Sequence, residues 1–178
     1  MKTEENPESA AGALPEAILA VGRAKSLTLS CAESCTGGAI GAYLTSLAGI
    51  SDVFMGSAVV YSNEAKKKLL GVEQGILDEH GAVSGECAES MARGALELYG
   101  TSLAVAVTGI AGPGGGSAEK PVGTVWFAVA SQTGDGVECA SFVRSLGGDR
   151  ELVRERAVRI ALGAVWRKMN EMRVPGFS

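Results

Sequence analysis

A serine and two glycines stand where a strand-like segment meets a helix-like one. The segment Cys31-Ala32-Glu33-Ser34-Cys35-Thr36-Gly37-Gly38 lies between a strand-like run, 27–30, and a helix-like run, 39–47. Glycines at such a junction let the backbone turn sharply and approach a ligand closely. A hydroxyl there can attack a carbonyl, and N–H groups at the helix start can hold the developing negative charge. One short segment can therefore supply both a nucleophile and an oxyanion hole, with the Ser34 hydroxyl as one candidate for the first and the backbone of Thr36, Gly37 and Gly38 for the second.

Two other interpretations of this segment stay open from the residues alone. Ser34 or Thr36 can simply cap the following helix, and the glycines can serve only the turn. Cys35 is a second candidate nucleophile. The sequence has one histidine, His80, so neither a Ser-His-Asp nor a Cys-His arrangement is well supported. An activated serine would then need a lysine whose pKa is lowered by burial or neighbouring charge.

A candidate for that lysine is Lys66, in the segment Tyr61-Ser62-Asn63-Glu64-Ala65-Lys66. The segment follows an apolar strand and opens a helix, so Lys66 falls in the first turn, near the positive end of the helix dipole. That position lowers the pKa of an amine, as a general base requires. Tyr61 can orient the lysine or the substrate. The alternative is that Asn63 caps the helix and the lysine is solvated.

A glycine-rich loop, 109–116, follows the apolar strand 103–107 and the polar residue Thr108. In open α/β sheets ligands bind beyond the carboxyl ends of strands, and glycine-rich backbone can wrap an anion such as phosphate. The loop lacks the pattern of a P-loop or a dinucleotide fingerprint, and a flexible connection is the competing interpretation. Arg150, at the start of the last expected helix, can bind a phosphate or carboxylate through its fork of N–H groups, or form a surface ion pair.

The rest of the chain predicts the elements that position these residues. Helical spacing or capping signals indicate helices, and apolar or β-branched runs indicate strands. Their alternation, without repeats or linkers, predicts one three-layer α/β/α domain with a mixed, mostly parallel sheet, spanning 14–178 after a leader at 1–13. The expected helices are 14–25, 39–47, 63–70, 84–99 and 149–172, and the expected strands are 27–30, 53–61, 103–107, 122–131 and 136–143.

Composition narrows the class of protein. The 178 residues carry a net charge of −4, which gives no support for a nucleic-acid partner. No apolar run approaches a membrane span, and the polar start of the chain is no signal peptide. The four cysteines lack the spacing of a zinc site, so we expect mostly buried, reduced thiols, no bound metal and a cytoplasmic protein.

Taken together, the motifs resemble the CinA C-terminal domain family, the PncC type of nicotinamide-nucleotide amidohydrolase. The resemblance covers about 14–172 and implies hydrolysis of the carboxamide of nicotinamide mononucleotide to nicotinate mononucleotide and ammonia, in bacterial pyridine-nucleotide recycling. It also implies a small-molecule nucleotide as partner, no cofactor, and a homodimer or higher assembly. The motifs that carry it are Ala32-Glu33-Ser34-Cys35-Thr36-Gly37-Gly38, Tyr61-Ser62-Asn63-Glu64-Ala65-Lys66, His80-Gly81-Ala82-Val83-Ser84, Thr108-Gly109-Ile110-Ala111-Gly112-Pro113 and Lys120-Pro121-Val122-Gly123-Thr124-Val125-Trp126.

The resemblance selects among the alternatives at the predicted site. It implies that Ser34 is the nucleophile and Lys66 the base, and that Tyr61 and Thr108 are polar site residues. Substrate-binding roles are expected for a further set, Glu33, Gly109, Gly112, Gly115 and Arg150. The chain departs from the expected family pattern at 114–116 and 145–147. Two other functions remain: a nucleotide-binding or competence-related module without catalysis, and hydrolysis of a different anionic amide.

Overall fold

The structure is a computed structural model that describes residues 13–172. Except for Ala13, the expected leader lies outside these residues, as do residues 173–178. The elements, in chain order, are α2 (Leu14–Lys25), β1 (Leu29–Glu33), α3 (Ala39–Thr45), the 3-10 helix η1 (Ile50–Asp52), β2 (Phe54–Val59), α4 (Asn63–Leu70), α5 (Gln74–Glu79), α6 (Gly85–Tyr99), β3 (Leu103–Gly109), β4 (Thr124–Thr133), β5 (Gly136–Ser145) and α7 (Arg150–Glu171).

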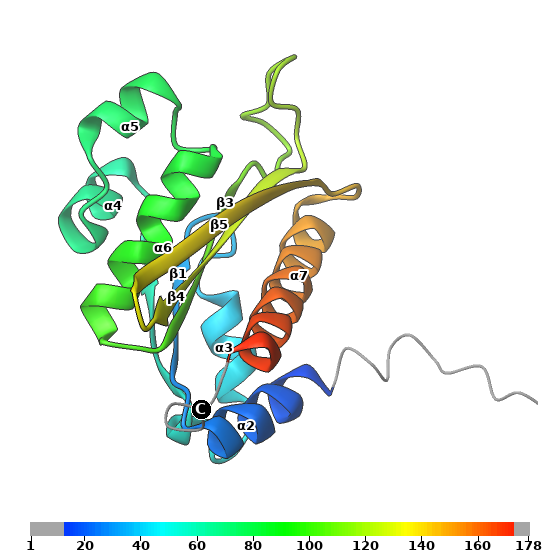
Figure 1. Cartoon of the computed structure of the whole chain (residues 1–178). Helices are drawn as coiled ribbons and strands as arrows, with labels where there is room; N and C mark the ends of the chain where they lie inside the picture. Colours follow the sequence, from blue (N-terminus) through cyan, green and yellow to red (C-terminus); the bar gives the residue numbers. More distant parts are fainter. Residues whose placement is uncertain (1–12, 173–178) are drawn as a thin grey trace, which may run out of the picture.

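The strands form one five-stranded sheet in the order β2-β1-β3-β4-β5. β1 pairs in parallel with β2 and β3, whereas β4 runs antiparallel to both of its neighbours, β3 and β5. Helix α6, with α4 and α5 beyond it, covers one face, and α7, α3 and α2 cover the other (Figure 1). The expected single α/β domain with a mixed sheet is therefore confirmed.

The central strand β3 shows how the two faces of the sheet become two cores. Val105 and Val107 point into the core beneath α2, α3 and α7, whereas Ala104 and Ala106 point into the core beneath α6. All four are completely buried, as a continuous apolar run predicts for a strand covered on both faces. The small side chains on the α6 face let that helix approach the sheet closely, since alanine projects little from the strand.

Helix starts are the best-predicted local features. The Ser84 hydroxyl accepts from Cys87 N–H at 3.1 Å, and the Asp149 carboxylate accepts from Leu152 N–H at 2.9 Å, so both act as the expected N-caps. The strand expected at 27–30 instead runs from Leu29 to Glu33. The register explains this difference, because every β1 residue pairs with both β2 and β3.

The sequence also led to expectations about membrane-spanning helices, metal sites and the burial of the cysteines. No helix within 13–172 combines the length and apolar character that crossing a bilayer requires. Those residues also contain no cluster of three or more potential metal-ligating His, Cys, Asp or Glu side chains. None of the four cysteines, all of which lie in the described part of the chain, forms a disulfide; Cys31, Cys35 and Cys87 are buried and Cys139 is partly buried, which confirms that the cysteines are mostly buried.

Candidate active site

Ser34 is the first residue after β1. Its N–H donates to the carbonyl of Val107 at 3.0 Å, which continues the pairing of β1 with β3 by one residue. The chain then turns away toward α3, which begins at Ala39. Ser34 is only 7% exposed. Its hydroxyl is therefore held at the carboxyl end of two parallel strands, the edge of an α/β sheet where ligands bind.

Lys66 meets Ser34 from a neighbouring element. It lies in the first turn of α4, whose N-cap, Ser62, accepts from Ala65 N–H at 3.1 Å. Lys66 Nζ lies 3.0 Å from Ser34 Oγ and donates to the Val60 carbonyl at 3.0 Å. The lysine is 1% exposed, so the interpretation of a solvated surface lysine does not hold for it. The two side chains that sequence reasoning paired are thus within hydrogen-bond distance.

Burial lowers the pKa of Lys66 from its usual value of 10.5, because the ammonium form loses its hydration. The neighbouring Cys87 and Cys35 oppose this and raise the pKa. The expected lowering of the pKa is therefore present, and its main cause is burial rather than the helix end. In the neutral form the amine can accept the Ser34 hydroxyl proton and still donate to Val60.

The lowered pKa of Lys66 predicts a pH-dependent stability. The unfolded chain binds more protons than the folded chain between the lowered pKa and 10.5, so stability rises with pH across that window and the penalty vanishes above it. A Lys66→Met variant should therefore melt above the wild type at about pH 7, and the gap should shrink toward about pH 10. Calorimetric melting of both proteins across this range checks the sign. A gap independent of pH would contradict the lowered pKa.

Cys35 is the alternative nucleophile, and the structure raises the pKa of its thiol, which disfavours the reactive thiolate. Burial raises the pKa of the Cys35 thiol to about 11, with Glu33 adding a smaller unfavourable effect against the lowering by Lys66 and Arg154. The thiolate, which is the reactive form of cysteine, is therefore scarce near neutral pH. His80 cannot help, because it lies near Glu79 and Glu86 and does not line the pocket around Ser34. The geometry favours the serine with the lysine.

Ser34 and Lys66 open into a pocket of about 280 Å³. The pocket holds both candidate catalytic groups, both polar site residues and the expected binding residues of the glycine-rich loop, together with Arg150. Larger hollows of about 630 and 480 Å³ lie elsewhere and contain none of these residues. The lining residues are Ser34, Cys35, Tyr61, Asn63, Lys66, Ala82, Val83, Thr108, Gly109, Ile110, Ala111, Gly112, Gly114, Gly115 and Arg150.

Glu33 is not among the lining residues, although a substrate-binding role was expected for it. Its side chain is completely buried, and its two oxygens accept from the N–H groups of Gly38, Ile40 and Gly41 at 2.9–3.0 Å and from the Ser57 hydroxyl at 2.8 Å. A carboxylate of the protein therefore already occupies the N-terminus of α3, where a substrate anion would otherwise bind.

The expected oxyanion donors are only partly available. Gly37 N–H donates to the Ser34 carbonyl at 3.1 Å and Gly38 N–H donates to Glu33 at 3.0 Å. Within the described residues Thr36 N–H has no such partner, which leaves it as the available donor of the three. The Thr36 hydroxyl is buried without a partner, so it does not cap the helix, and the Thr36 carbonyl accepts from Arg154 at 2.9 Å.

Three residues connect the opposite rims of the pocket. Arg150, at the start of α7, donates to the Gly112 carbonyl at 2.7 Å and to the Tyr61 hydroxyl at 3.1 Å. Tyr61 is 62% exposed, so it stands at the mouth of the pocket. Deeper inside, the Thr108 hydroxyl donates to the Ala82 carbonyl at 2.7 Å and fixes the segment before α6 against β3. The glycine-rich loop is thereby attached to the pocket rather than free.

Sequence reasoning missed some of the residues at the site. Asn63, Ala82 and Val83 line the pocket, and each lies in a motif that carried the family resemblance, so membership of those motifs was an available signal. Arg154 holds the Ser34–Gly38 turn from α7, and no local motif marks it. Its role depends on the packing of α7 near α3, which becomes visible only in the fold.

Comparison with known proteins gives consistent matches. The family model of the CinA C-terminal domain matches residues 12–169. The nicotinamide-nucleotide amidohydrolase PncC of Escherichia coli is 46% identical over 149 residues, covering 82% of this chain and 87% of that protein. A CinA-like protein of Geobacter metallireducens is 54% identical over 132 residues, covering 74% of this chain but 31% of its own length. The chain thus spans about a third of the CinA-like relatives that it matches.

Solved structures show the same fold. The competence damage-inducible protein A of Klebsiella pneumoniae superposes with a TM-score of 0.86 at 36% identity, covering 92% of this chain and 99% of that one. A competence/damage inducible protein of Agrobacterium tumefaciens superposes with a TM-score of 0.83 at 41% identity, covering 96% and 99% of the two chains. Both agree with the match to the family model.

Proposed function

Because the chain belongs to the CinA C-terminal domain family, we propose that it hydrolyses nicotinamide mononucleotide to nicotinate mononucleotide and ammonia. The observation that carries the proposal is the buried contact of 3.0 Å between Lys66 Nζ and Ser34 Oγ, in a pocket bordered by glycine-rich backbone. The similarity to the amidohydrolase PncC, which extends over most of both chains, supports the substrate.

Acylation is the first half of the proposed reaction. Neutral Lys66 takes the proton of the Ser34 hydroxyl as the oxygen attacks the carboxamide carbon. The negative charge that develops on the carboxamide oxygen is stabilised by backbone N–H groups, with Thr36 N–H as the donor available in the turn. One such donor contributes about 3 kcal/mol to lowering the barrier. The Lys66 ammonium then gives its proton to the leaving nitrogen, the C–N bond breaks, and ammonia departs.

Hydrolysis of the acyl-enzyme is the second half. Lys66, neutral again after acylation, takes a proton from water, and the water oxygen attacks the ester carbon. Collapse of the intermediate breaks the bond to Ser34 Oγ, which recovers its proton from Lys66. Nicotinate mononucleotide leaves as the acid. The Val60 carbonyl holds Lys66 Nζ in place through both halves, since it accepts one of its N–H groups.

The phosphate of the substrate would bind at the loop and at Arg150. The N–H groups of Ala111, Gly112, Gly114 and Gly115 have no partner within the described residues, and all four residues line the pocket. Clustered free N–H groups of this kind bind anions. Arg150 adds a positive charge at the same rim. The helix start of α3 is not available for this purpose, because Glu33 occupies it.

This assignment predicts a selective defect for Arg150→Gln. The KM for nicotinamide mononucleotide should rise about tenfold, the loss of one charge-assisted contact. The kcat/KM for nicotinamide riboside, which lacks the phosphate, should stay unchanged. Steady-state ammonia assays on both substrates measure the difference, with Arg159→Gln, an exposed change on the same helix, as the matched control. An equal loss on both substrates would show that Arg150 serves only to hold Tyr61 and Gly112.

A substrate panel tests the proposed function as a whole. Purified protein is incubated with nicotinamide mononucleotide, free nicotinamide, asparagine or glutamine, and ammonia is measured over time. We expect release from the mononucleotide alone, because the proposed reaction uses contacts of the pocket with both the carboxamide and the phosphate. Faster ammonia release from another amide would show that this amide, and not nicotinamide mononucleotide, is the preferred substrate. Release from none of the four would favour a binding module without catalysis.

A further inference from the structure

The strand β5 forms one edge of the sheet, and its outer side is open (Figure 1). It pairs with β4 without interruption over ten residues, from Gly136 to Ser145. The opposite edge, β2, is shorter, and a shift in its register near Gly56 disrupts regular pairing. Such irregularities protect an edge from joining another strand. Of the two edges, β5 is therefore the one suited to extend the sheet.

The outward-pointing backbone groups of β5 can be identified from its hydrogen bonds. The carbonyls of Val137 and Val143 accept from the side chains of Arg93 and Arg144, so they point away from β4. Backbone groups alternate along an antiparallel strand, so Cys139 and Ser141 also direct their N–H and C=O groups outward. These four residues present a regular row of donors and acceptors at the edge.

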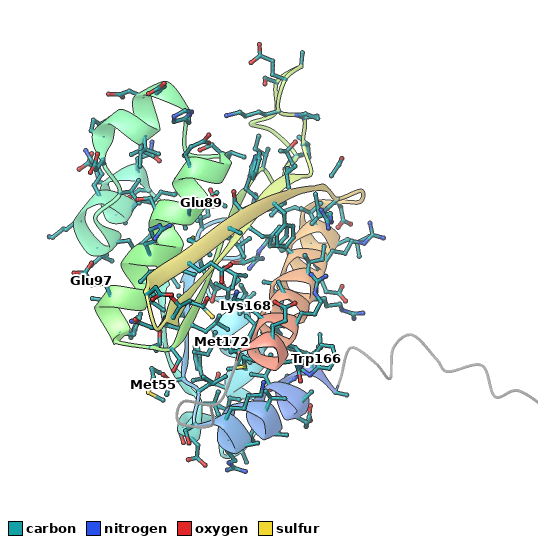
Figure 2. All side chains as sticks on the ribbon, in the orientation of Figure 1. Met55, Glu89, Glu97, Trp166, Lys168 and Met172 are labelled. Atoms are coloured by element: carbon teal, nitrogen blue, oxygen red, sulfur yellow. The ribbon has the colours of Figure 1, made fainter. Side chains whose placement is uncertain are left out.

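Both faces of β5 are already held by helices, which leaves the edge as its free side. On one face the Ser141 hydroxyl donates to Glu89 of α6 at 2.7 Å. On the other face Lys168 of α7 donates to Glu138 at 2.6 Å. Figure 2 shows Glu89 and Lys168 on these two helices. Each face of β5 thus contacts a helix, so a further strand can be added only at its edge.

The sequence of β5 is complementary to itself in one antiparallel register. If Ser141 lies opposite its own copy, Cys139 lies opposite Val143 and Ala140 opposite Phe142. The same register places Glu138 opposite the partner subunit's Arg144 on one face of the sheet. Because the arrangement is symmetric, this pair occurs twice, once at each end of the contact. Opposite charges facing each other across strands stabilise the pairing, whereas like charges destabilise it. The register also pairs outward-pointing residues with outward-pointing residues, as the hydrogen bonds require.

We propose that two copies of this chain join through their β5 strands in that register, around a two-fold axis at Ser141, so that the two sheets become one. Each Glu138 has an oxygen, Oε1, with no hydrogen bond within the described residues, because Lys168 binds Oε2. In the dimer the Val143 carbonyl would accept a hydrogen bond from the partner's Cys139 N–H. Arg144, which now donates to that carbonyl, would instead bind the carboxylate of the partner's Glu138. The contact is isologous, as in most dimers.

Charge reversal tests the register. The full chain should sediment as a dimer across a dilution series, and Glu138→Arg or Arg144→Glu should each weaken the dimer Kd at least about 100-fold, since like charges then face each other twice. The double variant Glu138→Arg/Arg144→Glu should restore the dimer. Glu16→Arg on α2, which makes the same charge change away from β5, is the control. Melting curves check that each variant is folded.

A crosslink gives a second readout that does not depend on charge. Ser141→Cys should form a disulfide between subunits on mild oxidation, because facing residues of a hydrogen-bonded pair lie about 5.5 Å apart between Cα atoms. Ala140→Cys should not, because in this register the two copies of residue 140 lie farther apart than a disulfide can span. A monomeric wild type, a dimer insensitive to both charge reversals, or equal crosslinking of both cysteine variants would overturn the proposal.

Discussion

Replacing Ser34 by alanine should abolish ammonia release from nicotinamide mononucleotide, lowering kcat by at least about 10³-fold. The change removes one oxygen atom that is 3.0 Å from the Lys66 amine. The other candidate nucleophile in the pocket, Cys35, has a pKa raised to about 11, so its thiol stays protonated near neutral pH. Continuous ammonia assays, with enough enzyme to detect the residual rate, measure the loss.

The control for this prediction is Cys35→Ala, the neighbouring candidate. It should keep its kcat within a few-fold of the wild type, because the cysteine supplies no reacting atom in the proposed mechanism. Circular dichroism and a melting curve establish that both variants are folded. The proposal would be contradicted if Ser34→Ala released ammonia at the wild-type rate, or if only Cys35→Ala lost activity. Either result would make Cys35 the candidate nucleophile in place of Ser34.

Lys66→Met should lower kcat by about 10²–10⁴-fold, the contribution that a general base typically makes. Methionine fills the space of the buried lysine stem and removes the amine, so the pocket should keep its shape. KM should change little, because the proposed base does not hold the substrate. Steady-state kinetics at several pH values measure both parameters, and the wild-type rate should rise with pH as Lys66 loses its proton.

Lys68→Met is the matched control for that variant. Lys68 lies two residues farther along α4 and is exposed, so the same substitution there should leave both kinetic parameters unchanged. A Lys66→Met variant that keeps its kcat but shows a raised KM would make the lysine a substrate-binding group. In that case the base would have to be sought elsewhere in the pocket.

From the residues alone, the pairing of Ser34 with Lys66 is one of several alternatives, and the family resemblance selects it. In the structure both residues follow parallel strands that end at the same edge of the sheet. The strand before Ser34 is longer than expected, yet Ser34 still lies at its end. Helix α4 begins and ends where the lysine-rich pattern and Gly71 predict. Local signals of this kind depend on neighbours in the chain, so they can be recognised without knowledge of the fold.

The role of Glu33 could not be predicted in the same way. Its partners are backbone groups five to eight residues ahead and a hydroxyl on β2, so they assemble only when α3 turns back against the sheet. The expected set of oxyanion donors is incomplete for the same reason, because the Gly38 N–H already donates to the Glu33 carboxylate. Long-range packing decides each of these cases.

The central claim is that Lys66 activates Ser34 as a nucleophile, and labelling by an alkyl fluorophosphonate tests it most directly. This reagent phosphonylates activated serines, and peptide mass spectrometry locates the adduct without depending on turnover. The account predicts an adduct on Ser34 of the wild type, forming faster as pH rises through the lowered pKa of Lys66, and no comparable labelling of Lys66→Met. An adduct on another residue, or equally fast labelling of Ser34 in the variant, would contradict it.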